Sequence, residues 1–219
     1  MKTASKISLK VCGMREFQNI DDLISLAPDF IGFIFYSQSK RYVGENFKLI
    51  DSIPSAVKKV GVFVNEERRS VLEKVKLHQL DFVQLHGSES VDDCRFFKDQ
   101  GVGVIKVFSV EDKLPDDRLP DYEPFVDYFL FDTRTPDYGG SGRKFDWEIL
   151  KDYKGSIPFF LSGGIKVEDI EEIKGLNIPS LYAIDMNSGL ELAPGMKDIA
   201  KVKKGVKALR GNTYKQEYK

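Results

Sequence analysis

The sequence predicts a single (β/α)8 barrel, an α/β fold in which eight parallel strands close into a ring and helices cover the outside. Three observations support this fold. Eight short segments rich in β-branched and aromatic residues recur along the 219-residue chain, and a helix-sized stretch follows each one. The segments are nearly continuous apolar runs, as expected for parallel strands buried on both faces. The predicted strands are Ile7–Val11, Phe30–Phe35, Lys59–Val64, Phe82–Leu85, Val104–Phe108, Tyr128–Phe131, Pro158–Leu161 and Leu181–Ile184.

Helical periodicity between the strands is clearest over residues 67–77 and 167–174. The fifth helix is predicted to be short or irregular, because three prolines interrupt residues 110–124. Three helices begin after a residue whose side-chain oxygen can cap the free amides of a first turn. These candidate N-caps are Asn65, Ser88 and Asp146.

An open, doubly wound sheet is the competing architecture. That fold would place a glycine fingerprint directly after the first strand. The chain instead reads Cys12-Gly13-Met14-Arg15 at this point, so the barrel is favoured. We expect the barrel domain to span residues 1–210 and a polar tail to follow over residues 211–219.

The composition argues against several classes of protein. The chain is 42% hydrophobic and 31% charged, and its net charge of -1 favours neither a nucleic-acid nor a membrane partner. It contains no apolar run near the roughly 18 residues of a transmembrane helix, and its first residues lack the apolar core of a signal peptide. Two cysteines do not make a disulfide framework. We therefore expect a cytoplasmic protein, either a monomer or a homodimer.

Polar residues collect where most of the predicted strands end. In a barrel these carboxyl ends form one rim, and barrel enzymes place their active sites there. The rim residues are Cys12, Ser37 to Arg41, Asn65, Gln84, His86, Ser109, Asp132, Ser162 to Gly164, Asp185 and Asn187 to Gly189.

The loops after the seventh and eighth strands predict a phosphate site. Glycines allow backbone amides to approach an anion closely, and a short helix after the eighth strand would direct its positive end toward it. These two loops are the usual phosphate-binding loops of barrel enzymes. The candidate phosphate-binding residues are Gly163, Gly164, Ser188 and Gly189.

An acid and a thiol stand on the same rim. Asp132 ends an apolar strand, where the lost hydration of its carboxyl group is costly unless the group is used, paired or protonated. It is a candidate general acid, and the alternative is that it caps the following loop through Thr133 or nearby amides. Just beyond it lies the glycine-rich segment 139–142, a candidate mobile loop. Cys12 ends the first strand. Its residue type alone fits a small buried side chain as well as a nucleophile or base, although nearby Lys10 and Arg15 would favour a thiolate.

Arg41 follows the second strand and can bind a substrate carboxylate through two parallel hydrogen bonds, although a solvated surface role suits it equally. Gln84, His86 and Asp185 are placed either to contact a substrate or to support the site. With only two histidines and no clustered ligands, the sequence gives no indication of a metal site.

The full set of motifs resembles the phosphoribosylanthranilate isomerase family of tryptophan biosynthesis. The matching segments run in order along nearly the whole chain. They are Lys10 to Met14, Gly32 to Phe35, Ser39 to Val43, Val60 to Asn65, Val83 to Gly87, Asp132 to Trp147, Leu161 to Ile165 and Asp185 to Asp198. Departures from the family's usual residues occur at Lys40, Ser141 and Asn187, and the lysine could alter the loop that carries Arg41.

The resemblance implies an Amadori rearrangement of N-(5-phosphoribosyl)anthranilate by acid–base catalysis, without a cofactor. By position, Asp132 matches the family's general acid and Cys12 its general base. Arg41 matches the arginine that holds the anthranilate carboxylate. The glycine segments after strands seven and eight match the phosphate site.

Two kinds of alternative stay open. The first is another phosphosugar barrel enzyme. Indole-glycerol-phosphate synthase would need a lysine and glutamate set, yet no matching glutamate follows Lys106, and a histidine-pathway isomerase would end its first strand in aspartate. The second is a non-catalytic barrel that binds a phosphorylated metabolite. A pure binding protein would need neither Cys12 nor Asp132.

Overall fold

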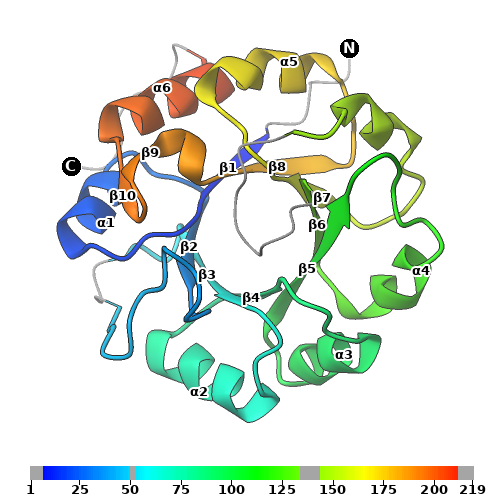
Figure 1. Ribbon diagram of the computed structural model, residues 1–219, viewed down its shortest axis with the longest axis horizontal. Helices are drawn as coiled ribbons and strands as arrows, with labels where there is room; N and C mark the ends of the chain where they lie inside the picture. The colour runs from blue at the N-terminus through cyan, green and yellow to red at the C-terminus, as the bar shows by residue number, and fades with distance from the viewer. Residues whose placement is uncertain (1–6, 50–52, 134–143, 212–219) are drawn as a thin grey trace.

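The computed structural model describes residues 7–49, 53–133 and 144–211, and its eight main strands form a closed parallel barrel (Figure 1). Each strand pairs with its neighbours in chain order, and β1 closes the ring by pairing with β8. All eight predicted strands are confirmed, with ends displaced by at most two residues. The strands are β1 Ser8–Val11, β2 Phe30–Ile34, β3 Lys58–Phe63, β4 Phe82–Leu85, β5 Gly103–Val110, β6 Tyr128–Thr133, β7 Phe159–Leu161 and β8 Leu181–Met186.

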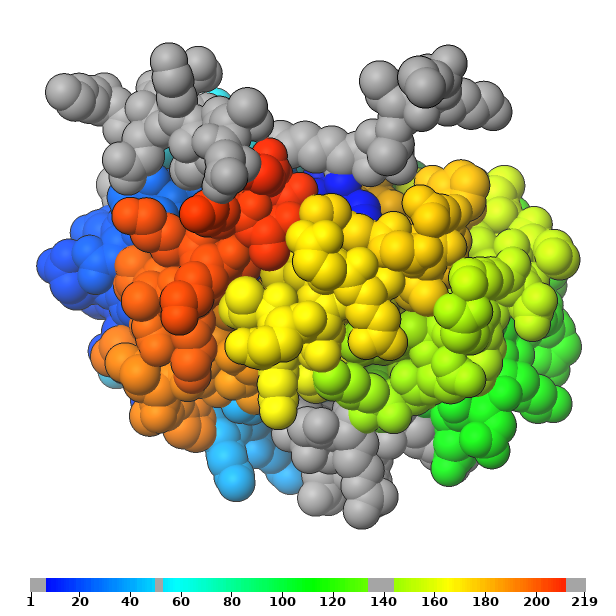
Figure 2. All heavy atoms as spheres, turned by 90° about the horizontal axis from the view of Figure 1, so that it is seen from above, coloured from blue at the N-terminus to red at the C-terminus, as the bar shows by residue number. Residues whose placement is uncertain are grey.

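Helices surround the barrel on its outside (Figure 1). Figure 2 shows α5 and α6 side by side on this outer surface, where they contact each other. The α-helices are α1 Phe17–Ile24, α2 Arg68–His78, α3 Val91–Asp99, α4 Leu119–Tyr122, α5 Ile170–Gly175 and α6 Ile199–Arg210. The 3-10 helices are η1 Glu123–Phe125, η2 Trp147–Asp152, η3 Val167–Asp169 and η4 Ser188–Leu190. A short hairpin of β9 Glu191–Ala193 and β10 Met196–Lys197 precedes α6.

The helix predictions are partly confirmed. The element after β5 is short and irregular as expected, because α4 spans four residues and continues as η1. Asp146 caps its helix through the amide of Glu148, although η2 is a 3-10 helix. The other two N-caps were predicted wrongly, since α2 is capped by Glu67 and α3 by Ser90.

The reasons for the two wrong caps are local. Asn65 adopts a left-handed backbone with φ of 50°, and its Oδ1 accepts hydrogen bonds from Ser88 instead of capping α2. Ser90 forms a reciprocal capping box with Asp93, which Ser88 lacks the spacing to form. The predicted polar tail lies outside the described residues apart from Gly211, so the domain boundary stays a prediction.

Strand side chains alternate between the helix layer and the barrel interior. The interior contains an apolar cluster at the amino-terminal ends of the strands, and this cluster includes Phe30, Leu130, Phe160 and Ala183. Two residues further along three of these strands, the inward positions become polar, as Asp132, Ser162 and Asp185. The packed apolar layer therefore forms the floor of a polar pocket.

Phe160 is fully buried in this floor, with its ring centroid 5.1 Å from that of Phe30. We expect Phe160→Ala to lower the free energy of unfolding by about 3–5 kcal/mol, because it leaves a cavity that the closed barrel cannot collapse. Leu77→Ala, at a 65% exposed position on α2, serves as the control and should change it by less than about 0.5 kcal/mol. Urea titration measures both, and equal effects would contradict a close-packed floor.

Candidate active site

One pocket at the carboxyl ends of the strands contains nearly all the predicted site residues. Gly189 alone does not line it. Instead, a Cβ on Gly189 would lie 2.1 Å from the carbonyl oxygen of Ile165, so this glycine allows the last two loops to pack together. The predicted residues that line the pocket are Cys12, Arg41, Gln84, His86, Asp132, Gly163, Gly164, Asp185 and Ser188.

Lys10 organises the side of the pocket that holds Cys12. Its buried ammonium donates to Asp185 Oδ2 at 2.6 Å and to Gln84 Oε1 at 2.8 Å. Burial raises the pKa of Cys12, although Lys10 opposes this. Burial also raises the pKa of Asp185, and Lys10 again acts in the opposite direction. Burial would lower the pKa of Lys10, but Asp185 and Cys12 together raise it. The thiol therefore lies beside a buried ion pair.

Asp185 also presents an unused acceptor to the pocket. Its Oδ1 is buried and has no hydrogen-bond partner among the described residues. A buried acceptor without a donor is costly, so this oxygen is suited to accept a hydrogen bond from a hydroxyl group of a bound ligand.

Asp132 lies in a more open part of the pocket and is held at both oxygens. Its Oδ1 accepts from the amide of Thr133 at 2.9 Å, and its Oδ2 lies 3.2 Å from His86 Nε2. The side chain is 22% exposed, so it is paired rather than deeply buried. The glycine-rich segment 139–142 lies outside the described residues.

The hydrogen bonds of Gln84 fix the orientation of His86. Because Gln84 Oε1 accepts from Lys10, its amide nitrogen faces His86 Nδ1 at 3.3 Å and can only donate. His86 Nδ1 is then the acceptor, so Nε2 carries the ring hydrogen toward Asp132. Polar contacts therefore link Lys10 to Asp132 across the barrel through Gln84 and His86.

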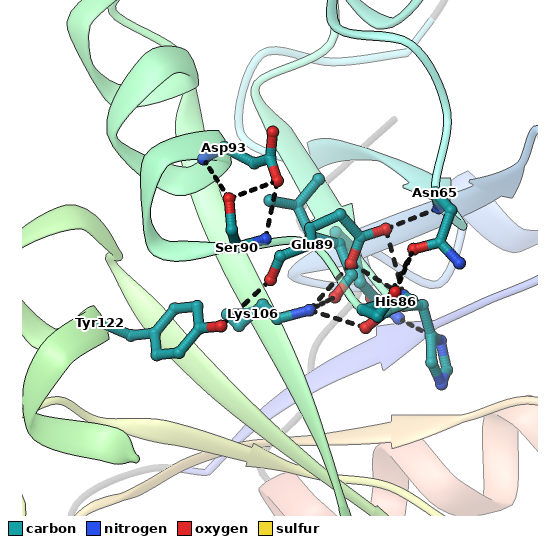
Figure 3. A network of polar contacts seen from close by, with 11 residues as sticks. Asn65, His86, Glu89, Ser90, Asp93, Lys106 and Tyr122 are labelled. Atoms are coloured by element: carbon teal, nitrogen blue, oxygen red, sulfur yellow. Dashed lines mark hydrogen bonds and ion pairs between the residues drawn. The ribbon is translucent and has the colours of Figure 1, made fainter.

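A second polar network holds the turn after β4 that carries His86 (Figure 3). Glu89 accepts from the amides of Asn65 and Gly87, and its Oε2 lies 2.8 Å from the buried ammonium of Lys106. Lys106 also donates to the carbonyl oxygen of Gly87 at 2.8 Å. Lys106 thus supports a loop and does not line the pocket, which disfavours the lysine-dependent synthase considered from the sequence.

Arg41 reaches the pocket while bound to Glu191. Its Nε and Nη2 donate to the two carboxylate oxygens at 2.8 and 2.7 Å, and both side chains are largely buried. Burial would raise the pKa of Glu191, but Arg41 and Lys197 lower it to about 2. Lys40 is exposed, and its carbonyl accepts from Arg15, so Glu191 rather than the Lys40 side chain holds Arg41.

Backbone conformations that favour glycine bring the loops close together. Gly163 and Gly164 have φ of 102° and 65°, and a Cβ on Gly163 would lie 2.1 Å from Thr133 Oγ1. Gly13, next to Cys12, has φ of 75°, and a Cβ there would lie 2.9 Å from Arg41 Cδ and 2.8 Å from Asn187 Oδ1. A side chain at Gly163 would therefore displace Thr133, and a side chain at Gly13 would displace Arg41 or Asn187.

Within the described ranges, no three His, Cys, Asp or Glu side chains are grouped as metal ligands. Nor does any helix there have the length and apolar character needed to cross a membrane.

The closed barrel and the polar pocket at the carboxyl ends of its strands define a (β/α)8-barrel enzyme. A family model described as N-(5'-phosphoribosyl)anthranilate (PRA) isomerase matches residues 9–208. The chain belongs to this family.

Individual relatives agree with the family assignment. The N-(5'-phosphoribosyl)anthranilate isomerase of Parabacteroides distasonis is 50% identical over 198 residues, which cover 89% of this chain and 90% of the relative. A crystal structure of the Thermotoga maritima phosphoribosyl anthranilate isomerase superposes with a TM-score of 0.81 at 33% identity, covering 94% of this chain and 99% of that one. A crystal structure described as phosphoribosyl anthranilate isomerase in complex with reduced 1-(o-carboxyphenylamino)-1-deoxyribulose 5-phosphate superposes with a TM-score of 0.78 at 30% identity, covering 94% of this chain and 99% of that one.

Sequence reasoning missed three charged residues around the pocket. Lys10 was considered only as a neighbour of Cys12 along the chain, although two-residue alternation puts both side chains inside the barrel. Glu191 had no local signal, because its partner Arg41 lies 150 residues away. Lys197 pairs with Glu191 across the short hairpin, which the sequence analysis did not predict.

The raised pKa of Cys12 predicts how its alkylation rate should depend on pH. A raised pKa leaves little thiolate at neutral pH, so alkylation of Cys12 by iodoacetamide should be slow at pH 7 and should accelerate as the pH rises. We expect the midpoint of the rate profile to lie above about pH 8.5, the ordinary thiol value. The experiment uses the Cys94→Ala variant, so that Cys12 is the only thiol, with mass spectrometry as readout. A midpoint below that value would contradict burial as the dominant influence.

Proposed function

We propose that this protein converts N-(5'-phosphoribosyl)anthranilate into 1-(2-carboxyphenylamino)-1-deoxyribulose 5-phosphate, with Cys12 as general base and Asp132 as general acid. The observation that carries this proposal is that one pocket combines a thiol, a carboxyl group, an arginine and two glycine-containing loops. The relatives' names state the isomerase activity, and the phosphorylated ligand in one related structure fits a pocket of this composition.

The acid step opens the sugar ring. Asp132, in its acid form, donates a proton from Oδ2 to the ribose ring oxygen. The bond between this oxygen and the anomeric carbon breaks, and the nitrogen lone pair forms a Schiff base with that carbon. Because Thr133 holds Oδ1, Oδ2 is the oxygen left to carry the proton.

The base step completes the isomerisation. Cys12, as thiolate, removes the proton from C2, and the electron pair of that bond neutralises the Schiff base to give an enolamine. Proton return to the anomeric carbon and loss of the hydroxyl proton yield the ketone, so the rearrangement is internally redox-balanced and requires no cofactor. Lys10 stabilises the thiolate that this step needs, since its ammonium opposes the effect of burial.

The substrate's two ends are assigned to different residues of the pocket. We assign its phosphate to Gly163, Gly164 and Ser188, with Gly189 allowing their loops to pack, and its anthranilate carboxylate to Arg41. Gln84, His86 and Asp185 contact or orient the central part of the substrate. The cytoplasmic location and the oligomeric state stay predictions.

Turnover, followed by the loss of substrate fluorescence, tests the acid and the base. Asp132→Asn keeps an oxygen for the Thr133 amide but cannot protonate the ring oxygen. Cys12→Ser replaces the thiol by a hydroxyl group, which is a far weaker acid and therefore supplies almost no anion to act as the base. We expect each variant to lose about 10²- to 10⁴-fold in kcat. Calorimetry with the reduced product analogue should show binding within a few-fold of wild type, and Cys94→Ala serves as the active control. Near-normal kcat in either variant would refute the corresponding role.

Competition by inorganic phosphate tests the loop assignment. Gly163→Ala forces a side chain against Thr133, which should displace the loop and raise the inhibition constant of phosphate by roughly tenfold or more. Gly175→Ala is the matched control, because a Cβ there meets only open space, and it should leave the constant unchanged. Equal constants in the two variants would exclude this loop from the phosphate site.

A further inference from the structure

The hydrogen bonds of Arg41 leave one edge of its guanidinium group available. Arg41 has five N–H donors, and those on its side-on edge, Nε and Nη2, are directed at Glu191. Among the described residues Nη1 has no acceptor, and Arg41 lines the pocket. The end-on edge, formed by Nη1 and the second hydrogen of Nη2, can therefore bind another carboxylate through two parallel bonds.

Glu191 is itself held on several sides. Its Oε1 accepts from Lys197 Nζ at 2.7 Å and from the amide of Gly195 at 3.0 Å, both within the β9–β10 hairpin. Lys197 stands opposite Glu191 in that hairpin. Its backbone is fixed by Asn19 of α1, whose side chain accepts from the Lys197 amide at 2.7 Å and donates to the carbonyl oxygen at 2.9 Å.

Lys197 also corrects the charge balance at Arg41. Glu191 alone would cancel the net charge of Arg41, so an anion would be attracted only through the remaining N–H donors. Lys197 is fully buried, and its ammonium contacts Glu191 and, at 2.7 Å, Asn187 Oδ1. Two cations and one anion leave a single net positive charge on the cluster, which matches a ligand with one carboxylate.

We propose that Glu191 and Lys197 are positioning residues, which hold Arg41 with its end-on edge toward the carboxylate of the substrate's aromatic ring. The proposal rests on the role assigned to Arg41 above. It makes carboxylate recognition a property of three side chains from β9, β10 and the loop after β2, with Gly13 providing the space for the stem of Arg41.

Two ligands separate positioning of Arg41 from general damage to the fold. The first is the reduced product analogue, 1-(o-carboxyphenylamino)-1-deoxyribulose 5-phosphate in reduced form, and the second is its counterpart without the ring carboxylate. For Glu191→Gln we expect the dissociation constant of the first to rise roughly tenfold or more, because a charge-assisted pair is lost, and that of the second to stay within about twofold. In turnover, KM should rise while kcat changes little.

Glu171→Gln is the matched control. Glu171 is 72% exposed and its carboxylate pairs with Lys174 on the outer helix α5, so this variant should bind both ligands like wild type. Lys197→Met is the second variant, and its loss of charge should weaken only the ligand with the carboxylate. It also keeps the proposal testable if Glu191→Gln fails to fold. In an Arg41→Met background, Glu191→Gln should add no further loss.

The outcomes separate this inference from the proposed function. If Arg41→Met does not distinguish the two ligands, the assignment of Arg41 to the carboxylate is wrong, and the positioning proposal falls with it. If Arg41→Met distinguishes them but Glu191→Gln and Lys197→Met do not, the positioning proposal alone is wrong. Equal weakening of both ligands by Glu191→Gln would indicate structural damage and would also overturn it.

Discussion

The ammonium group of Lys10, enclosed inside the barrel, is the constraint on which the site depends. A buried charge without a partner is strongly destabilising, so Lys10 must meet the carboxylate of Asp185. These two residues are register partners across β1 and β8, the pair of strands that closes the ring. A slip by one residue would turn Lys10 toward the helices and Cys12 with it. The ion pair therefore favours the same strand register that places the thiol in the pocket.

The pocket combines two different electrostatic environments. Cys12 lies in the drier part, where burial raises its pKa and the ammonium groups of Lys10 and Lys197 oppose that effect. Asp132 lies in a partly exposed part, beside a histidine whose hydrogen is directed by Gln84. Because Gln84 contacts both Lys10 and His86, the two environments share one rigid amide. The proposed base and acid thus differ in hydration while their positions are linked through a single side chain.

The sequence predicted the barrel and the location of the pocket well, because both follow from short-range patterns. Continuous apolar runs marked the strands, and polar residues just beyond them marked the rim. The errors arose where a partner is chosen by tertiary folding. Asn65 had the right residue type for an N-cap, yet its side chain bonds to Ser88. Arg41 was predicted as a candidate carboxylate ligand, but its pairing with Glu191 depends on folding across 150 residues of chain.

Gly13 shows how little sequence variation this arrangement tolerates. Its backbone passes the stem of Arg41 and the amide of Asn187 at distances that leave no room for a methyl group, and it directly follows Cys12. Most surface positions of a barrel can vary independently of one another. At Gly13, which follows Cys12, a single added carbon would clash with both Arg41 and Asn187. A change at Gly13 would therefore alter the position of Arg41, and with it the pocket, even though Gly13 itself carries no functional group.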